Sequence, residues 1–422
     1  MRQVRVGIGL SVVVLAVVTA GPSLTRAAGY EADPVQSASK LLPAPLLGGP
    51  RFKVQDGAPT DDYMPRFTIQ SDFGEYVVSG SEMVAVRVQE IAALDKLEEI
   101  SKTDAFAGAM AASAKKTGKA VVNAASNPKE TVEGVPKGVG RFVKGVGKKA
   151  KKAGGAAADS VTDDDDEVPS QPKSTEQKAG EAAKSVTGAN KAKRGIAKQF
   201  QIDPYSNNAA LQKKLDELAM AMSAGGLAMS VVNPIPLAST VASVNNLVWD
   251  VPAPDLRDMN DKKLAALGVT PATRKALFAN SFFTPTQQTG FVTALSALTG
   301  VTGADAAVAL AARKASSEDD ARFFRRSAEI LAQYQKLAGP IASLEARTSI
   351  FVAQSRSGAL VVPAAVDYLT WTEAVDRFSA EPVAGAKTRE VWLSGQVSPT
   401  AGAELKSRGW VVKERVARSA GK

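Results

Sequence analysis

The chain has 422 residues, of which 45% are hydrophobic and 23% charged, so it is long enough for two or three domains of ordinary size. It contains no Cys and no His, which excludes disulfides, thiolate metal sites, cysteine nucleophiles, Ser-His-Asp triads and the usual zinc sites. The formal net charge is +9, and residues 106–155 alone hold 11 Lys and Arg against two Glu, so this segment carries the whole excess.

The N-terminus has the pattern of a targeting segment. Two arginines in the first five positions precede an apolar run over residues 7–20, which is too short to span a bilayer comfortably. Small residues at Ala20 and Ala27 offer cleavage sites, and an uncleaved anchor is the alternative. We therefore expect residues 1–28 to be a signal peptide and the protein to be exported to the periplasm.

Residues 29–104 are expected to begin with an extended arm and a β-hairpin. The stretch 30–66 is rich in Pro and Gly, which favours an arm with one short strand at 52–55. Apolar residues then alternate over 67–79 on either side of an Asp-Phe-Gly turn, a pattern typical of a hairpin.

A helix should complete this segment. From Val84 to Ile100 apolar residues recur at steps of three and four, and Ser81 is a suitable cap. The helix should therefore run to about Ser101, with its charged residues, Glu90 among them, on the other faces.

The basic segment 105–150 combines one apolar stripe with many lysines. Asn127 and Pro128 form a good helix start, and apolar residues follow at steps of three and four up to Val146. Several glycines and Pro136 make this helix marginal in water, but an anionic surface could order it. A solvated tail, or a helix packed on its own protein, is the alternative. The residues predicted to contact a membrane or a partner are Lys129, Lys137, Arg141, Phe142, Lys144, Lys148 and Lys149.

Residues 151–200 have the composition of a long disordered linker, because Ala, Gly, Ser and Lys cannot bury a core. The linker contains the acidic run Asp163–Glu167. This run lacks the spaced acids and the turn glycine of an EF-hand, so we interpret it as a solvated patch rather than a calcium site.

An uncharged stretch of 32 residues, Leu218 to Trp249, lies at the centre of the second half. Pro234 and Pro236 divide it, which predicts a helical hairpin over residues 209–249. Each uncharged arm is too short for the roughly 30 Å hydrocarbon core of a bilayer. We therefore expect a hairpin buried within a helical domain, residues 201–346, and membrane insertion is the alternative.

The remaining helices of this domain are predicted from their start signals. The expected starts are Asn260, Thr270, Thr284, Gly303 or Ala304, and Ser317. The residues of the last helix expected to face a core are Phe324, Ala328, Leu331 and Leu337.

The period of the pattern changes in residues 347–418, which predicts a small α/β unit. Its expected elements are a β-hairpin over 349–363, a short helix from Thr372, a strand at 390–394, a helix capped by Ser398 and a strand at 410–415. The last three should form a strand–helix–strand unit with parallel strands and a right-handed crossover.

Few residues suggest chemistry. The sequence has no GxGxxG and no GxxxxGK[ST] motif, so a nucleotide site is not expected. The turn from Gly395 to Pro399 leads into a helix N-terminus and could bind an anion, although a plain capped helix is the default. Adjacent acids such as Glu98 and Glu99 do not face each other on a helix, and Trp392 and Trp410 are more often core residues than ligand contacts.

These patterns predict an α+β protein that is mostly α, with a helical domain around a buried apolar hairpin, a small N-terminal β-hairpin plus helix, a C-terminal α/β unit and a long disordered linker. The predicted function is that of an exported, non-enzymatic interaction or scaffold protein of the cell envelope, peripherally associated with an anionic membrane surface or bound to an acidic envelope protein. No cofactor, metal, nucleotide or nucleic acid is expected. The alternatives are a carboxylate-dependent hydrolase acting on an envelope polymer and a membrane-inserting protein that uses residues 209–249.

Overall fold

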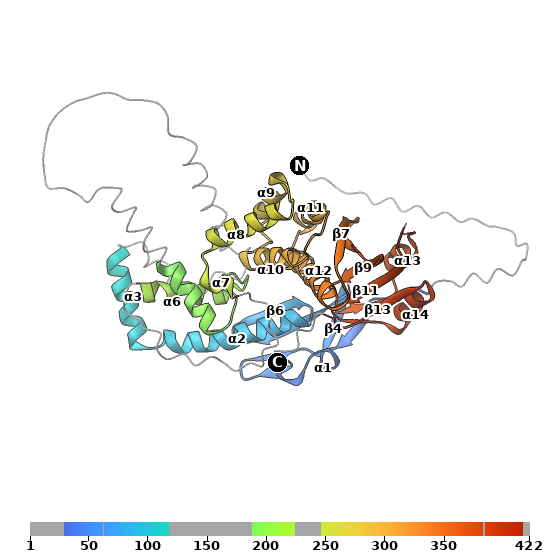
Figure 1. Ribbon diagram of the computed structural model, residues 1–422. Coiled ribbons are helices and arrows are strands. Elements are labelled where there is room, and N and C mark those ends of the chain that lie inside the picture. The colour runs from blue at the N-terminus through green and yellow to red at the C-terminus, as the bar shows by residue number, and fades with distance from the viewer. Residues whose placement is uncertain (1–28, 62, 118–187, 224–245, 383–384, 417–422) are drawn as a thin grey trace, which may run out of the picture. The chain divides into compact units, whose positions relative to one another are not determined.

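The chain divides into two compact units, Met1–Tyr30 and Glu31–Lys422, and every helix and strand named below belongs to the second (Figure 1). The computed structural model describes residues 29–61, 63–117, 188–223, 246–382 and 385–416. This part mixes helices and sheets, which confirms the α+β class in its broad form. None of the helices within it is long and apolar enough to cross a membrane.

An N-terminal sheet precedes the first long helix. Its elements are β1 (Val35–Ser37), α1 (Ala38–Leu41), the 3-10 helix η1 (Ala44–Leu46), β2 (Gly48–Gly49), β3 (Phe52–Val54), β4 (Gly57–Asp61), β5 (Met64–Ser71) and β6 (Gly74–Ser79). The strand order is β1-β4-β5-β3-β2, and β6 pairs with β5 as the predicted hairpin. The arm was expected to hold only β3. It also forms β1, β2 and β4, because strands of two to five residues are too short to show an alternating pattern.

Helix α2 (Ser81–Ser101) extends from this sheet to a group of helices (Figure 1). Val84 and Val88, in its first half, are buried with the core of the N-terminal sheet. Leu94 and Leu97, in its second half, are buried in a separate helical core. At a rise of 1.5 Å per residue the helix spans about 31 Å, so one rigid element belongs to both cores.

The start of α2 differs from the expectation. Gly80, with φ of 85°, occupies the cap position, and Ser81 is the first helical residue. Ser81 does not cap the helix through its side chain. Its backbone N–H donates to Oδ2 of Asp367 at 2.6 Å, so a carboxylate from 286 residues further along the chain satisfies this helix end.

A helical cluster forms around the second half of α2. Its other members are α3 (Asp104–Thr117), the helix at 188–199 and α6 (Ala209–Ser223). The prediction of a disordered linker over 151–200 is wrong for its last part, because Ile196 and Ala197 of this helix are buried in the core that α6 provides. Leu211, Leu215 and Leu218 of α6, which are spaced by four and three residues and so share one helix face, are all fully buried. Residues 224–245, and with them most of the predicted hairpin, lie outside the described residues.

The next helices cover residues 247–337. They are α7 (Leu247–Asp250), α8 (Ala253–Ala266), α9 (Pro271–Ala279), α10 (Pro285–Ser296), α11 (Ala304–Lys314) and α12 (Glu318–Leu337). The predicted caps Thr270, Thr284 and Ser317 each accept a hydrogen bond from the backbone N–H three residues on.

Two expectations for these helices are wrong. Helix α8 begins at Ala253, seven residues before Asn260, and Asn260 is buried within it, where its amide donates to Thr289. A buried asparagine with a distant partner was mistaken for a cap. Leu337 is 66% exposed because it is the last residue of α12, beyond the core contacts.

A C-terminal sheet of order β13-β11-β9-β8-β7 completes the fold. Its strands are β7 (Ile341–Ala346), β8 (Phe351–Ser355), β9 (Ala359–Ala364), β11 (Thr388–Leu393) and β13 (Trp410–Lys413). Strands β9, β11 and β13 are parallel, as predicted for the last two, whereas β7, β8 and β9 form an antiparallel meander. β7 falls in a stretch that was expected to be helical. It pairs with β8, a partner that its own sequence does not reveal.

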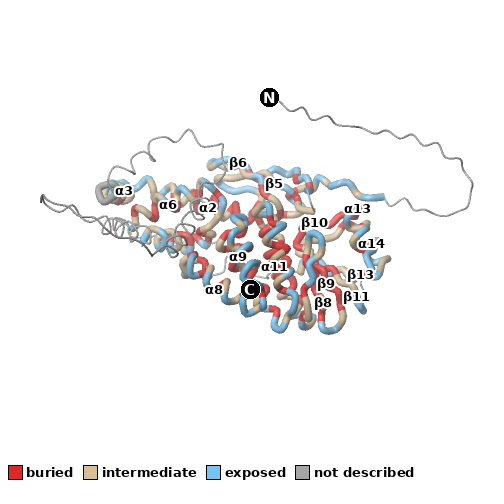
Figure 2. The backbone as a smooth tube through the Cα atoms, turned by 90° about the horizontal axis from the view of Figure 1, so that it is seen from above, coloured by how far each residue is buried: buried red, intermediate tan, exposed pale blue. Residues whose placement is uncertain are grey.

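Helices cover both faces of this sheet. Val361 and Trp392 face the core that includes α10, α11 and α12. Leu360 and Val362 face the core that includes α13 (Glu373–Ala380) and α14 (Pro399–Ser407). β8 and β9 are therefore almost wholly buried, as Figure 2 shows. The short strands β10 (Tyr368–Leu369) and β12 (Gln396–Val397) form a separate parallel pair.

Gly303 offers a test of how tightly α11 packs on β7. Its φ is 77°, and a Cβ atom there would lie 2.1 Å from the backbone oxygen of Leu344. Gly268 has nearly the same φ, 75°, but open space around it. We expect Gly268→Ala to lower the free energy of unfolding by about 1–2 kcal/mol through backbone strain alone, and Gly303→Ala by about 1–3 kcal/mol more because β7 must move. Denaturant unfolding of both variants checks this, and equal losses would contradict the packing.

Candidate functional site

The seven residues predicted to contact a membrane or a partner lie outside the described residues, within 118–187. The structure does describe where the chain leaves for this segment and where it returns. α3 ends at Thr117, the described chain resumes in the helix at 188–199, and both helices contribute to the same core as α6.

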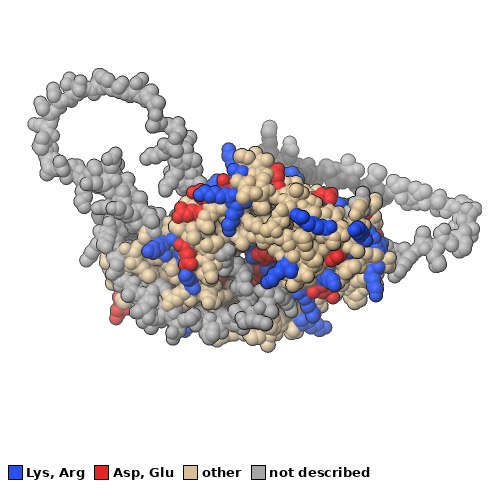
Figure 3. Space-filling view, in the orientation of Figure 1, with Lys and Arg blue, Asp and Glu red and all other residues tan. Residues whose placement is uncertain are grey.

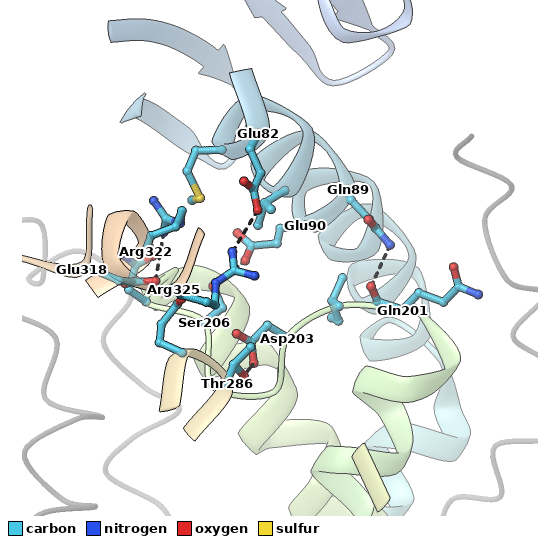
Figure 4. A pocket seen from close by; sticks show the side chains of 15 residues that line it. Glu82, Gln89, Glu90, Gln201, Asp203, Ser206, Thr286, Glu318, Arg322 and Arg325 are labelled. Atoms are coloured by element: carbon cyan, nitrogen blue, oxygen red, sulfur yellow. Dashed lines mark hydrogen bonds and ion pairs between the residues drawn. The ribbon is translucent and has the colours of Figure 1, made fainter. Parts of the chain in front are cut away.

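Among the described residues, a polar cavity is lined by α2, the loop 200–208, α10 and α12 (Figure 4). Four carboxylates and two guanidinium groups line it: Glu82, Glu90, Asp203, Glu318, Arg322 and Arg325. We call this space, together with these six side chains, the polar cavity. Its volume is about 40 Å³, against roughly 300–1,000 Å³ for small-molecule pockets. The cavity accommodates a few water molecules but no metabolite.

Glu90 is the most deeply buried of these carboxylates, at 1% exposure, although it was expected on an outer face of α2. It pairs with Arg87 one turn earlier, and it accepts hydrogen bonds from the hydroxyl of Ser206 and from the amide of Asn208. Arg87 also donates to Asn207 at 2.9 Å. The loop 200–208 folds back on α2 and supplies these partners, so both oxygens of the buried Glu90 carboxylate are bonded, while Nε of Arg87 has no partner among the described residues.

Glu82 joins α2 to α12. Its carboxylate pairs with Arg325 at 3.0 Å and with Arg326 at 2.9 Å, and Arg325 also pairs with Glu329. Burial alone would raise the pKa of Glu82, but the guanidinium groups of Arg326, Arg325 and Arg322 lower it to about 2. This carboxylate is therefore ionised at neutral pH and well below it.

Asp203 has the opposite electrostatics. Its Oδ1 accepts hydrogen bonds from the hydroxyl of Thr286 at 2.6 Å and from the backbone N–H of Tyr205 at 2.8 Å. Burial outweighs these bonds and raises the pKa of Asp203 to about 6, and the charges of Glu318 and Glu90 act in the same direction. In Figure 4 its side chain points toward that of Thr286.

Glu318 completes the set at the first turn of α12. It pairs with Arg322 at 3.2 Å, and Arg322 also pairs with Asp319 at 2.7 Å. Burial raises the pKa of Glu318, although the charges of Arg322 and Arg87 oppose the shift. Two carboxyls with raised pKa values thus lie beside two that are firmly ion-paired.

The carboxylates of the polar cavity are bonded within the protein. Every carboxylate of the polar cavity is bonded to an Arg, a hydroxyl or an amide of the same chain. Within the described ranges, no three acidic side chains are grouped so that they could hold a metal ion. The cavity has room for water, and its ion pairs and hydrogen bonds connect α2, α12 and the loop 200–208.

The sequence analysis missed this site, although one signal was available. Arg87 and Glu90 are three residues apart, and Glu318 and Arg322 are four apart, which is the spacing of charge pairs on one helix face. The carboxylates considered instead point elsewhere: Glu98 pairs with Arg51 and Glu99 with Lys96.

Comparison of this chain with protein-family models, with curated proteins and with solved structures gives no match.

Replacing Glu90 should show how much the buried pair matters. Glu90→Gln leaves the Arg87 charge buried without its carboxylate, and removing one partner of such a pair costs about 3–5 kcal/mol. The matched control is Glu99→Gln on the same helix, where an exposed pair with Lys96 has the same spacing. That change should cost at most about 1 kcal/mol. Denaturant unfolding measures both, and similar losses would show that the buried pair is not stabilising.

Asp203→Asn should change how stability depends on pH. The raised pKa means that the folded state holds this proton more tightly than the unfolded state, so wild-type stability falls as pH rises from 3.8 toward about 6. Asn keeps the Oδ1 acceptor without the charge. We expect the variant to equal the wild type near about pH 4 and to exceed it by up to about 3 kcal/mol above about pH 7.

Asp305→Asn is the control variant, because its stability relative to the wild type should change with pH in the opposite direction. The backbone N–H of Thr270 lowers the pKa of the Asp305 carboxyl below 3.8, so the ionised group stabilises the fold above that pH. Asp305→Asn should therefore become less stable than the wild type as pH rises. If both variants show the same sign in unfolding experiments, the raised pKa of Asp203 is wrong.

Proposed function

We propose that the protein is an exported, non-enzymatic scaffold of the cell envelope, which uses its basic segment 105–150 to contact an anionic membrane surface or an acidic partner. The observation that carries this proposal is the placement of charge. Residues 106–155, which begin within α3 and end before the helix at 188–199, hold 11 Lys and Arg against two Glu, a net charge of +9.

The attachment of this segment supports the proposal. Lys193, in the helix at 188–199, pairs with Asp216 of α6 at 2.7 Å. Ile196 and Ala197 of the same helix are fully buried in one core with Leu215, and Phe106 of α3 packs against that core. The chain thus leaves one helical cluster at the end of α3 and returns to it at the helix 188–199, and α2 joins this cluster to the N-terminal sheet. A folded helical cluster can in this way hold a charged stretch of chain between two of its helices.

The charge pattern of the described surface also fits. On the face drawn in Figure 3, Lys and Arg are interspersed with Asp and Glu rather than gathered in one basic patch. Such a surface gives little net attraction to an anionic bilayer. Each Lys or Arg near an anionic membrane contributes about 1 kcal/mol, so the basic segment would dominate any such contact.

The two alternatives receive less support. Insertion of residues 209–249 would have to separate Leu211, Leu215 and Leu218 from the helical core in which they are fully buried. We retain the buried hairpin as part of the proposal. A carboxylate-dependent hydrolase is favoured only by the raised pKa of Asp203. Release of soluble fragments from envelope polymer by the wild type but not by Asp203→Asn would establish it.

Flotation with lipid vesicles tests the membrane form of the proposal. The mature protein should float with vesicles rich in anionic lipid at low salt, should be released by high salt, and should not float with neutral vesicles, because the attraction is electrostatic. In the test variant, glutamine replaces the basic residues Lys129, Lys137, Arg141, Lys144, Lys148 and Lys149, and this variant should stay in solution.

The control variant removes the same number of charges from the described surface. Glutamine replaces the exposed lysines Lys53, Lys262, Lys275, Lys314, Lys336 and Lys413. This protein should still float. If the two variants lose binding equally, the basic segment has no special role. If the wild type never floats, contact with a membrane is wrong and an acidic partner protein is the remaining form.

A further inference from the structure

The carboxyl edge of the parallel strands β9, β11 and β13 has the features of a ligand site. Helices α13 and α14 begin at this edge, after β9 and β11 respectively, with Thr372 and Ser398 as their N-caps. In parallel α/β sheets, ligands bind outside the carboxyl ends of the strands, and helix N-termini favour anions.

The chain places a carboxylate of its own at this edge. Trp371 donates its backbone N–H to Oε2 of Glu31 at 2.6 Å, and its carbonyl accepts the N–H of Glu31 at 2.8 Å. The hydroxyl of Ser398 also donates to Oε2 of Glu31. Glu31 is separated from Trp371 by 340 positions and from Ser398 by 367. This is a contact between distant segments rather than a local turn.

The hydroxyl of Ser398 and the backbone N–H of Trp371 are buried and oriented toward the carboxylate of Glu31. The Ser398 oxygen accepts the N–H of Ala401 at 3.0 Å as an N-cap, so its own hydrogen is directed to Glu31. Ser398 and Trp371 are each 1% exposed. In the described part of the chain, N–H and O–H donors hold the Glu31 carboxylate, and no Lys or Arg pairs with it. The Glu31 carboxylate is therefore held by the positions of these N–H and O–H donors and not by a surface ion pair.

Two nearby features strengthen this reading. The guanidinium of Arg408, which pairs with Asp376 and Glu404, lies 4.4 Å from the centre of the Trp371 ring and packs against it. Thr370, also 1% exposed, has an Oγ1 with no hydrogen-bond partner among the described residues. The edge thus holds a buried polar group beyond those that Glu31 uses.

The arm that carries Glu31 is extended and is held at a second place. Pro34 accepts a hydrogen bond from Thr60 at 2.9 Å, and β1 pairs antiparallel with β4. Residues 31–37 therefore connect the C-terminal sheet to the N-terminal sheet as an extended peptide. The backbone pair between Glu31 and Trp371 is the kind of contact that any extended peptide can make.

We propose that this edge is a binding site for an extended peptide that bears a carboxylate, and that the chain fills the site with its own arm, residues 31–37. The arm acts as a tethered ligand. The carboxylate supplies specificity through Ser398 and Trp371, and the backbone pair supplies orientation. None of the residues of the basic segment takes part, so the site and the proposed function can fail separately.

The test supplies the arm from outside. The full mature chain carries Glu31→Ala, which removes the internal carboxylate, and the probe is a labelled peptide with the sequence of residues 31–37, EADPVQS. A second peptide has Gln in place of the Glu. Hydrogen bonds to a charged group justify an expectation of roughly tenfold tighter binding for the Glu peptide, measured by fluorescence anisotropy.

Two further chains complete the test. The wild type should bind the Glu peptide at least about tenfold more weakly than Glu31→Ala does, because its own arm occupies the site. Glu31→Ala combined with Ser398→Ala should lose the preference for Glu over Gln. Where the alanine variant does not fold, Glu31→Gln replaces it. Equal binding of the two peptides, equal binding by wild type and variant, or no binding at all would each overturn the proposal.

Discussion

The burial of ion pairs between α2 and α12 is the constraint on which the rest of the structure depends. Arg325 on α12 is buried and pairs with the half-buried Glu82 on α2, and Glu90 on α2 is buried with Arg87. Each buried charge costs several kcal/mol unless its partners are in place. The pairs form only when α2, α12 and the loop 200–208 are all correctly placed. The charges therefore set the register of these three segments, while the apolar cores supply most of the free energy.

The same helix explains how the N-terminal and C-terminal sheets are connected. Asp367, which follows β9, accepts the first N–H of α2, and Tyr63, which follows β4, bonds through its hydroxyl to Thr372 at 2.6 Å. Glu31 makes the third contact at the same carboxyl edge. N-terminal elements thus supply partners for the helix ends of the C-terminal unit, and the C-terminal unit supplies one for α2. Each sheet satisfies backbone groups that the other leaves open.

The use of charge divides the protein into two parts. In the described part, many charged side chains form ion pairs with other residues of the chain, such as those of Glu82, Glu318 and Arg408. The excess of positive charge falls in residues 106–155, which begin within α3 of the helical cluster. The proposed electrostatic contact of the basic segment is compatible with the folded structure of the described part, because the two use different charged residues.

Local interactions are what the sequence determined by itself. The caps Thr284, Ser317 and Ser398 were predictable because a cap bonds an N–H only three residues away. The β5–β6 and β8–β9 hairpins were predictable for the same reason, since each turn and its alternating strands are contiguous. Tertiary structure alone decided the burial of Glu90, the raised pKa of Asp203, the strand at β7 and the place of Glu31. Each of these depends on a partner supplied by another segment of the chain, and a single sequence does not show which distant residues will meet.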